Sequence, residues 1–216
     1  MKKRRDRHLG NEEGFIHTVI LGAIVLAIAI AALWANAGKT NNSMASGKAA
    51  YGRAASVIEQ GATFRLGFET ITAGGVPASS VTFDTNSGTG LLNPSLSGIS
   101  QQYPDKTLLA ASTNTWVYKA DGSNNAVVRI QGIGVDASAD YVVVLPDLTQ
   151  AACQNINQAL TGSTSIPAPA AGTLAAWSTS AAAIDLSADA AANRLSEACV
   201  QTTDTKYVYY KVLSEV

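Results

Sequence analysis

The feature that most constrains this chain is a step from charged to apolar sequence within its first 34 residues. Residues 1–14 are rich in charge, whereas residues 15–34 contain no Lys, Arg, Asp or Glu over twenty positions. A helix rises about 1.5 Å per residue, so residues 15–34 would extend roughly 30 Å, the thickness of the hydrocarbon core of a bilayer. We therefore expect residues 15–34 to form a transmembrane helix.

The charges of residues 1–14 predict the orientation of that helix. Five basic residues stand against three acidic ones, so the segment is net basic and should stay in the cytoplasm. The rest of the chain would then lie outside the cytoplasm. The alternative is a secretory signal cut after Ala37, because Ala35-Asn36-Ala37 has the A-x-A form of such sites. That alternative leaves a secreted or, if uncut, membrane-tethered binding domain.

The junction Glu12-Glu13-Gly14-Phe15, followed by the apolar segment, resembles the type IV pilin family. In that family a short basic leader ends in Gly, and an aromatic Phe begins the mature protein. The resemblance implies that a prepilin peptidase cuts between Gly14 and Phe15 and methylates the new amino group of Phe15. It also implies that the apolar helix is kept, first in the inner membrane and later in a filament core.

Val19 departs from the family, which usually has Glu as the fifth mature residue. In the family that Glu is thought to pair with the terminal amine of a neighbouring subunit. Val19 therefore suits a minor or tip subunit, or a divergent system. His17 is the only titratable side chain of the span, and we expect it to reach the membrane interface rather than replace the Glu.

Composition narrows the classes of partner. Residues 15–216 carry ten Lys plus Arg and thirteen Asp plus Glu, with no basic patch, so we predict no nucleic-acid binding. Charged residues make up only 14% of the chain, against about 25% in typical soluble domains. A surface so poor in charge suits a subunit that is buried between neighbours.

Residues 35–72 are expected to contain a soft polar segment followed by an amphipathic helix. Residues 35–47 are rich in Gly, Asn and Ser, which favour helices weakly. From 45 to 66, apolar and small residues recur at helical spacing, whereas Lys48, Arg53 and Glu59 fall largely off the stripe. The stripe consists of Tyr51, Ala54, Ala55, Ile58, Ala62 and Leu66. We expect it to pack on a globular head formed by residues 73–216.

The head is predicted to be α+β. Gly, Pro and Asn punctuate residues 72–112, which should be mostly loop with a short strand at 81–83. Three strands at 115–119, 126–132 and 141–145 suggest an antiparallel meander. A helix should run from 146 to 160, with Leu148, Ala152, Ile156 and Leu160 on one face, and a last strand covers 206–213. The long N-terminal helix would pack on this antiparallel sheet.

The only two cysteines, Cys153 and Cys199, should form a disulfide in an oxidising compartment. The loop-entropy model gives such a bridge about 4 kcal/mol. It would close the C-terminal loop 153–199, most of which is low-complexity Ala, Ser and Thr sequence. A C-terminal disulfide loop also resembles the D-region of pilins.

Two short segments resemble one branch of that family, the type IVb pilins of the conjugative thin-pilus group. Residues 143–153, with Pro146 and the run Gln150-Ala151-Ala152-Cys153, resemble the strand, proline and helix start of these pilins. Residues 75–80 resemble their Val-Pro-Ser segment.

Residues for catalysis are missing from the predicted head. The only histidines, His8 and His17, lie in the leader and the apolar span, so a Ser-His-Asp triad or a histidine zinc site cannot form in the head. We interpret Asp136 and Asp140 as solvated hairpin residues rather than a catalytic or Ca²⁺ pair. Gly88-Thr89-Gly90 and Gly132-Ile133-Gly134 look like turns rather than phosphate loops. The aromatic residues Trp116, Tyr118, Tyr207, Tyr209 and Tyr210 are expected in the core rather than on a sugar-binding surface.

The sequence therefore predicts a structural subunit of a type IV pilus-like filament and no enzyme, cofactor or metal site. Its expected partners are other pilin subunits, the prepilin peptidase and the assembly machinery of the inner membrane. The precursor would cross the inner membrane once, and the assembled protein would lie on the cell surface.

Overall fold

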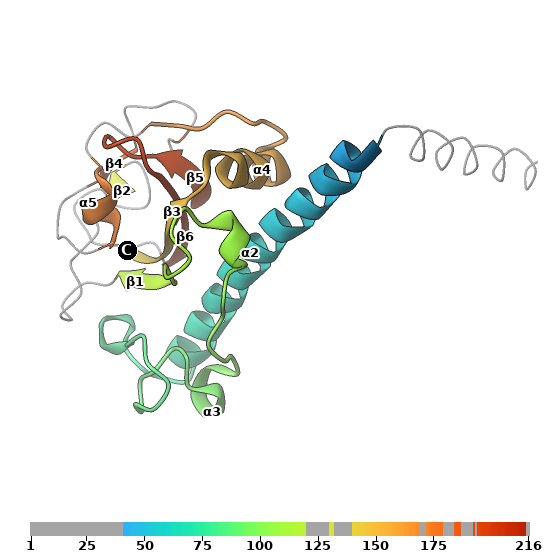
Figure 1. Ribbon diagram of the computed structural model, residues 1–216. Coiled ribbons are helices and arrows are strands. Elements are labelled where there is room, and N and C mark those ends of the chain that lie inside the picture. Colours follow the sequence, from blue (N-terminus) through green and yellow to red (C-terminus); the bar gives the residue numbers. More distant parts are fainter. Residues whose placement is uncertain are drawn as a thin grey trace, which may run out of the picture. The chain divides into compact units, whose positions relative to one another are not determined.

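The computed structural model describes residues 41–119, 130–131, 140–168, 172–178, 184–186, 192 and 194–214. The chain divides into two compact units, Met1–Lys48 and Ala49–Val216, and the second contains the sheet described below (Figure 1). Predictions for residues 1–40, including the cleavage between Gly14 and Phe15, His17, Val19 and the cleavage after Ala37, lie outside the described residues. Within the described part of the chain, no helix is long and apolar enough to cross a membrane.

The first described element is a long helix, α2 (Asn41–Ala73). Its first residues lie in the stretch that we predicted to be a soft polar segment before the helical pattern begins at residue 45, so that prediction is wrong for residues 41–44. Extending a helix is much easier than starting one, and Lys48, Ala49 and Ala50 are good helix formers, so the helix extends back through Asn and Ser. The helix also continues seven residues past Leu66, because Phe68 and Ile71 are buried against the head.

The buried face of α2 is not the predicted stripe. Its residues recur every three or four positions and are Ala54, Val57, Gly61, Phe64, Phe68 and Ile71. Of the predicted stripe only Ala54 is buried; Tyr51 is 45% exposed and Leu66 62% exposed. The physical reason is that phenylalanine rings bury far more apolar area than the alanines on which the predicted stripe depended. The structure thus has a helix over the predicted residues, but the face assigned to the head is wrong.

The head contains a four-stranded antiparallel sheet with the order β1-β3-β6-β5. The strands are β1 (Val117–Lys119), β3 (Tyr141–Leu148), β6 (Tyr207–Ser214) and β5 (Glu197–Gln201). The α+β fold with an antiparallel sheet is therefore confirmed. Strand β5 was not predicted, and it forms one edge of the sheet next to β6.

The predicted meander is wrong in its middle strand. Of residues 126–132 the structure describes β2 (Ile130–Gln131), which pairs in parallel with β4 (Ile184–Asp185) and not with β1 or β3. The predicted strand at 81–83 is reduced to one bridge between Thr82 and Gly90. Strand β1 therefore pairs directly with β3, at the register Tyr118 to Val143.

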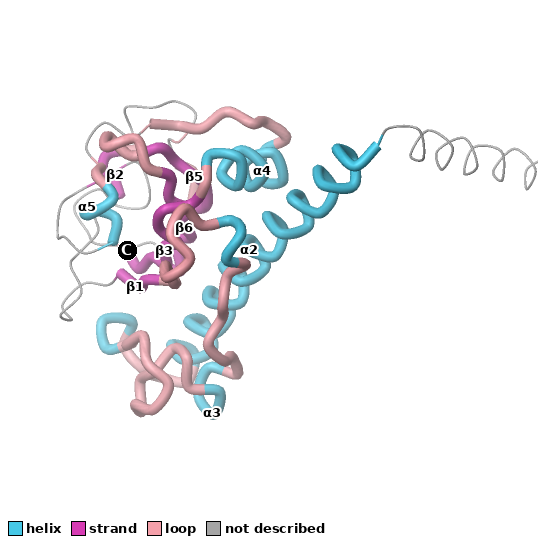
Figure 2. Tube along the Cα trace, viewed as in Figure 1, coloured by secondary structure: helices cyan, strands magenta, loops and turns pink. Residues whose placement is uncertain are grey.

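Two clusters of buried side chains cover the two faces of the sheet, whose strands are labelled in Figures 1 and 2. On one face, Val143, Leu145 and Tyr209 belong to a core shared with α2 and with α4 (Gln150–Thr161). On the other face, alternate residues of the same strands pack around Trp177 of α5 (Leu174–Ser178). Because side chains alternate along a strand, the sheet is buried on both sides.

The connection from β3 to α4 differs from its prediction. Strand β3 continues through Pro146 to Leu148, with a register irregularity between Leu145 and Leu148 and a positive φ of 56° at Asp147. Helix α4 begins only at Gln150, where the hydroxyl of Thr149 accepts a hydrogen bond from Ala152 N at 3.2 Å. The predicted helix start at 146 is therefore wrong, because a bulge absorbs the proline within the strand.

The end of α4 is as predicted. Gly162 follows the helix in the left-handed conformation, with φ of 76°, and its N–H is bonded to Gln158 O. Ala152 and Ile156 are buried, and Leu160 packs against the same core.

Residues 74–112 are mostly loop, as expected, with the short helices η1 (Ala78–Ser80), α3 (Pro94–Ser97) and η2 (Lys106–Leu108). The carboxylate of Asp84 organises the turn that contains Gly88-Thr89-Gly90. It accepts hydrogen bonds from the Thr82 hydroxyl and from the backbone N–H of Asn86 and Ser87, which lower its pKa to about 2. These contacts confirm Gly88-Thr89-Gly90 as a turn.

Candidate functional site

Helix α2 has a second apolar face, which the described part of the head leaves partly exposed, although Ile58 at its edge packs against the core. We call it the outer stripe, and its members are Tyr51, Ala55, Ile58, Ala62 and Leu66. At about 100° per residue, these five positions fall within a sector of about 80°, which begins about 40° from the edge of the buried face. Ala55 and Ile58 are half-buried, and the other three are exposed. Among the described residues the large exposed hydrophobic side chains are Tyr51, Leu66 and Tyr103, and two of these lie on the stripe.

The head holds α2 firmly from the opposite side. The side-chain amide of Gln60 accepts a hydrogen bond from Trp116 Nε1 at 2.8 Å and donates one to Tyr103 O at 3.1 Å. Arg53 lies 3.9 Å from the carboxylate of Asp105. The backbone N–H and hydroxyl of Thr107, and then Arg53, hold the pKa of Asp105 below its usual value. These contacts fix which face of α2 points outward.

Glycines on the buried face set how closely α2 approaches the head. A Cβ at Gly61 would collide with the hydroxyl of Tyr209, and a Cβ at Gly67 would lie 2.7 Å from Ile99 Cδ1. Tyr209 is fully buried, and its hydroxyl donates a hydrogen bond to Glu197, which also pairs with Lys211. Burial, followed by the charge of Glu197, raises the pKa of Tyr209 well above its usual value, so this hydroxyl stays protonated.

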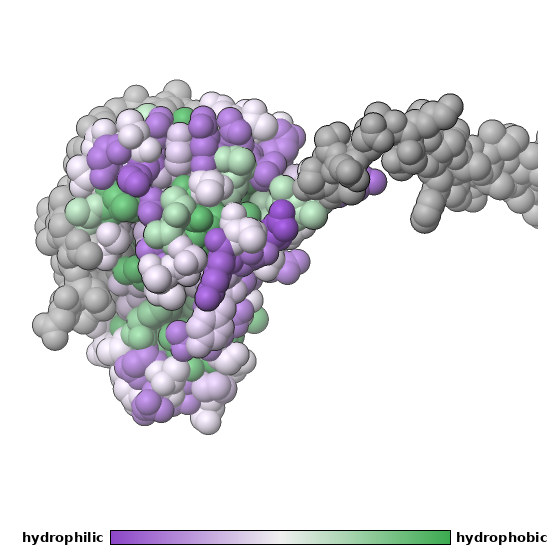
Figure 3. All heavy atoms as spheres, viewed as in Figure 1, coloured by the Kyte–Doolittle hydropathy of each residue, from purple (hydrophilic) through white to green (hydrophobic). Residues whose placement is uncertain are grey.

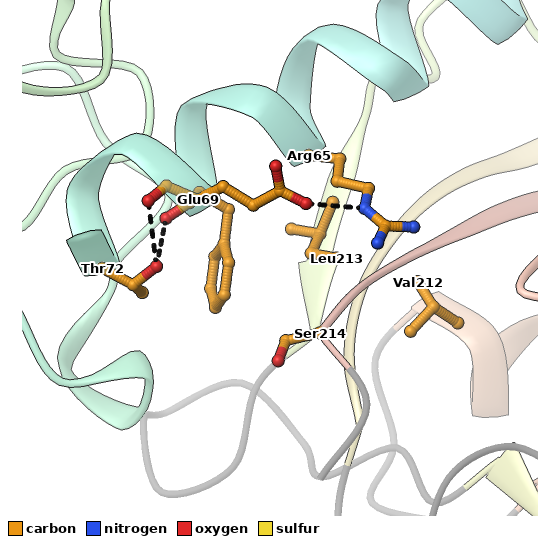
Figure 4. A pocket seen from close by; sticks show the side chains of 7 residues that line it. Arg65, Glu69, Thr72, Val212, Leu213 and Ser214 are labelled. Atoms are coloured by element: carbon orange, nitrogen blue, oxygen red, sulfur yellow. Dashed lines mark hydrogen bonds and ion pairs between the residues drawn. The ribbon is translucent and has the colours of Figure 1, made fainter.

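A hollow of about 340 Å³ opens beside the C-terminal half of α2 and the end of β6 (Figure 4). Arg65 and Glu69 lie on its α2 side and form an ion pair of 2.9 Å, while Phe68 and Leu213 add apolar surface. The Thr72 hydroxyl donates to the backbone oxygens of the preceding turn. Both charged side chains are about half exposed, so the pair contributes little to stability.

A second hollow of about 240 Å³ lies beside the end of α4 and is lined by Asn157, Thr161, Ser163, Ser165, Pro167, Leu195 and Ala198. Neither hollow presents a catalytic arrangement of side chains. In the part of the chain that the structure describes, no three His, Cys, Asp or Glu side chains gather as a metal site would require.

The predicted disulfide is confirmed. Cys153 of α4 and Cys199 of β5 are bonded, with their Cα atoms 5.3 Å apart, and both are fully buried. The bridge joins positions 46 residues apart and ties the edge strand β5 to α4.

Sequence reasoning missed Asn157, which binds the same strand one helical turn after Cys153. Its Nδ2 donates to Cys199 O at 2.7 Å and to Ser165 O at 2.8 Å, while its Oδ1 accepts from Cys199 N at 2.9 Å. The side chain is 3% exposed, and these three bonds use both of its donor hydrogens. Asn157 follows Cys153 by four residues, so the two side chains share one helix face, and this spacing could have indicated the role of Asn157.

The other side chains considered from the sequence are mainly structural. Trp116, Tyr118, Tyr209 and Tyr210 are buried and Tyr207 is half-buried, which confirms the core interpretation of these aromatic residues. Asp140 is only 1% exposed, so its interpretation as a solvated hairpin residue is wrong. Asp136 lies outside the described residues. Asp140 is buried because it directly precedes β3, which is an inner strand of the sheet.

Comparisons of the chain with protein-family models, curated proteins and solved structures found no match. Hydrophilic and hydrophobic residues are intermixed on the face of the molecule in Figure 3.

Proposed function

We propose that this chain is a structural subunit of a type IV pilus-like filament. In this proposal a prepilin peptidase cuts between Gly14 and Phe15, and the apolar segment 15–34 waits in the inner membrane as a helix. Assembly machinery then moves it into a filament made with other pilin subunits, where burial between helices replaces burial in lipid. The precursor is an inner-membrane protein, and the assembled subunit is displayed at the cell surface.

The observation that carries the proposal is the outer stripe. A helix that only anchors a head needs one apolar face, but α2 also carries exposed apolar side chains outside its buried face, at Tyr51, Ala62 and Leu66. Burying one leucine side chain gains about 1.5–3 kcal/mol. Leu66, which is mostly exposed, therefore has free energy to gain when another helix covers it. The low charge of the chain and its N-terminal junction support the same assembly.

The stripe suggests a direct test of assembly in the native host. Leu66→Asp should lower the amount of this subunit in sheared filaments about tenfold, because it removes apolar burial worth at least 1.4 kcal/mol and adds a charge. Tyr103→Asp is the matched control, since Tyr103 is 69% exposed but lies off the helix. Immunoblots of filaments and of the membrane fraction measure both variants. Equal incorporation of the two variants, at equal membrane levels, would contradict the proposal.

A further inference from the structure

We infer that Asn157 is a positioning residue for formation of the Cys153–Cys199 disulfide. It holds the backbone of Cys199 against α4 before the two thiols are oxidised. The inference concerns maturation of the head and does not depend on the proposed filament function.

Three side chains from two elements, Cys153 and Asn157 of α4 and Cys199 of β5, lie together. Cys153 and Asn157 are four residues apart on α4, so they project from the same helix face. Both contact the same residue of β5, Cys153 through sulfur and Asn157 through the backbone N–H and C=O of Cys199. Cys199 is therefore held by two independent attachments.

Strand β5 lies at the edge of the sheet. An edge strand leaves one row of backbone groups unpaired, and burying such groups without partners costs free energy. On this edge of β5, the side chain of Asn157 bonds the N–H and C=O of Cys199. Two residues along the same edge, Pro167 O accepts a hydrogen bond from Gln201 N at 2.7 Å. The amide of Asn157 thus takes the place of a neighbouring strand.

None of these hydrogen bonds requires the sulfur–sulfur bond. With both cysteines reduced, Asn157 can still hold Cys199 beside Cys153 and keep the two thiols close together. Without its amide, the buried N–H and C=O of Cys199 lose their partners, and β5 can move away from α4. Asn157 therefore raises the effective concentration of one thiol at the other.

The chemistry is ordinary thiol–disulfide exchange with a small or protein disulfide as the oxidant. With glutathione disulfide, the thiolate of one cysteine attacks a sulfur, forms a mixed disulfide and releases one glutathione thiolate. The second cysteine thiolate then attacks the protein sulfur of the mixed disulfide and releases the other. Two protein thiols lose two protons and two electrons, which reduce one glutathione disulfide to two thiols.

The test uses the full-length protein, purified in detergent and equilibrated in glutathione redox buffers. Alkylation of free thiols and intact mass give the fraction oxidised, and hence the effective concentration of the cysteine pair. Asn157→Ala should lower this effective concentration at least tenfold, equivalent to about 1.4 kcal/mol. Asn155→Ala is the matched control, because Asn155 is the same residue type on the same helix with partial exposure, and it should stay within twofold of the wild type. An unchanged value for Asn157→Ala would overturn the inference.

A second measurement covers the case in which Asn157→Ala fails to fold. The double variant Cys153→Ser, Cys199→Ser cannot form the bridge. In this variant, hydrogen exchange measures how strongly the backbone amide of residue 199 is protected. We expect this amide to stay protected at least tenfold relative to an exposed loop amide, because Asn157 Oδ1 still accepts from it. Exchange as fast as that of the loop would show that Asn157 does not hold β5 without the disulfide.

Discussion

At the scale of the residue, single atoms decide how closely helix and sheet can pack. Gly61 faces the hydroxyl of Tyr209, which is fully buried and bonded to Glu197, so the ring has little freedom to move. The sequence could not assign this role to Gly61, because a glycine within a helix indicates only a weaker helix. Asn157 was missed for a different reason, because its hydrogen-bond partners are 8 and 42 residues away in the chain.

Replacing Gly61 with alanine should destabilise the protein by about 1–3 kcal/mol, because the added methyl group collides with Tyr209. The higher helix propensity of alanine, about 1 kcal/mol, offsets only part of that loss. Gly52→Ala is the control: a Cβ at Gly52 meets nothing within 4 Å, so it should stabilise the helix slightly. Urea unfolding measures both changes. If Gly61→Ala proved as stable as Gly52→Ala, the close contact with Tyr209 would be refuted.

Replacing Cys153 with serine should cost up to about 4 kcal/mol, because the unfolded chain regains the freedom of a long loop. The measurement is thermal unfolding of the variant and the wild type without reductant. Wild-type protein unfolded in excess dithiothreitol is the control and should match the variant. A melting temperature unchanged by the substitution would mean that the bridge does not contribute to stability.

At the scale of the element, the sequence indicated that residues 45–66 form an amphipathic helix but not which face the head covers. Both faces of α2 carry apolar residues at helical spacing, so periodicity alone cannot choose between them. The choice depends on tertiary contacts, in which Phe64 packs against Trp116 and Phe68 packs against Tyr141. The start of α4 was misplaced because Pro146 is a common helix-start residue that here sits in a strand bulge.

Truncating a side chain should destabilise the protein strongly on the buried face of α2 and only slightly on the outer stripe. Phe64→Ala should cost about 3–5 kcal/mol, because it opens a cavity in the core. Leu66→Ala, two residues along the same helix, should change the free energy of unfolding by less than about 0.5 kcal/mol, because its side chain is mostly exposed. Urea unfolding of the unassembled protein measures both. Comparable losses would mean that the head covers the outer stripe.

At the scale of the whole molecule, the α+β class and the disulfide followed from the sequence, whereas the strand order did not. The α+β class came from strand-like runs at 115–145 and 206–213 together with the predicted helices, and the disulfide followed from the presence of two cysteines. Strand β5 was missed because Val200 is the one β-branched residue among its five residues, and none of the five is aromatic. The pairing of β3 with β6 joins segments more than fifty residues apart, which local patterns cannot specify.

The central claim is that the chain is processed as a prepilin, and the N-terminus of the mature protein tests it most directly. The protein should be purified from the envelope of its own cells and examined by intact mass and N-terminal sequencing. We predict a start at Phe15 that carries the added mass of one methyl group, which would establish prepilin processing. A start at Gly38 would contradict the claim and make the apolar segment an export signal, and an intact Met1 would leave a membrane-tethered domain.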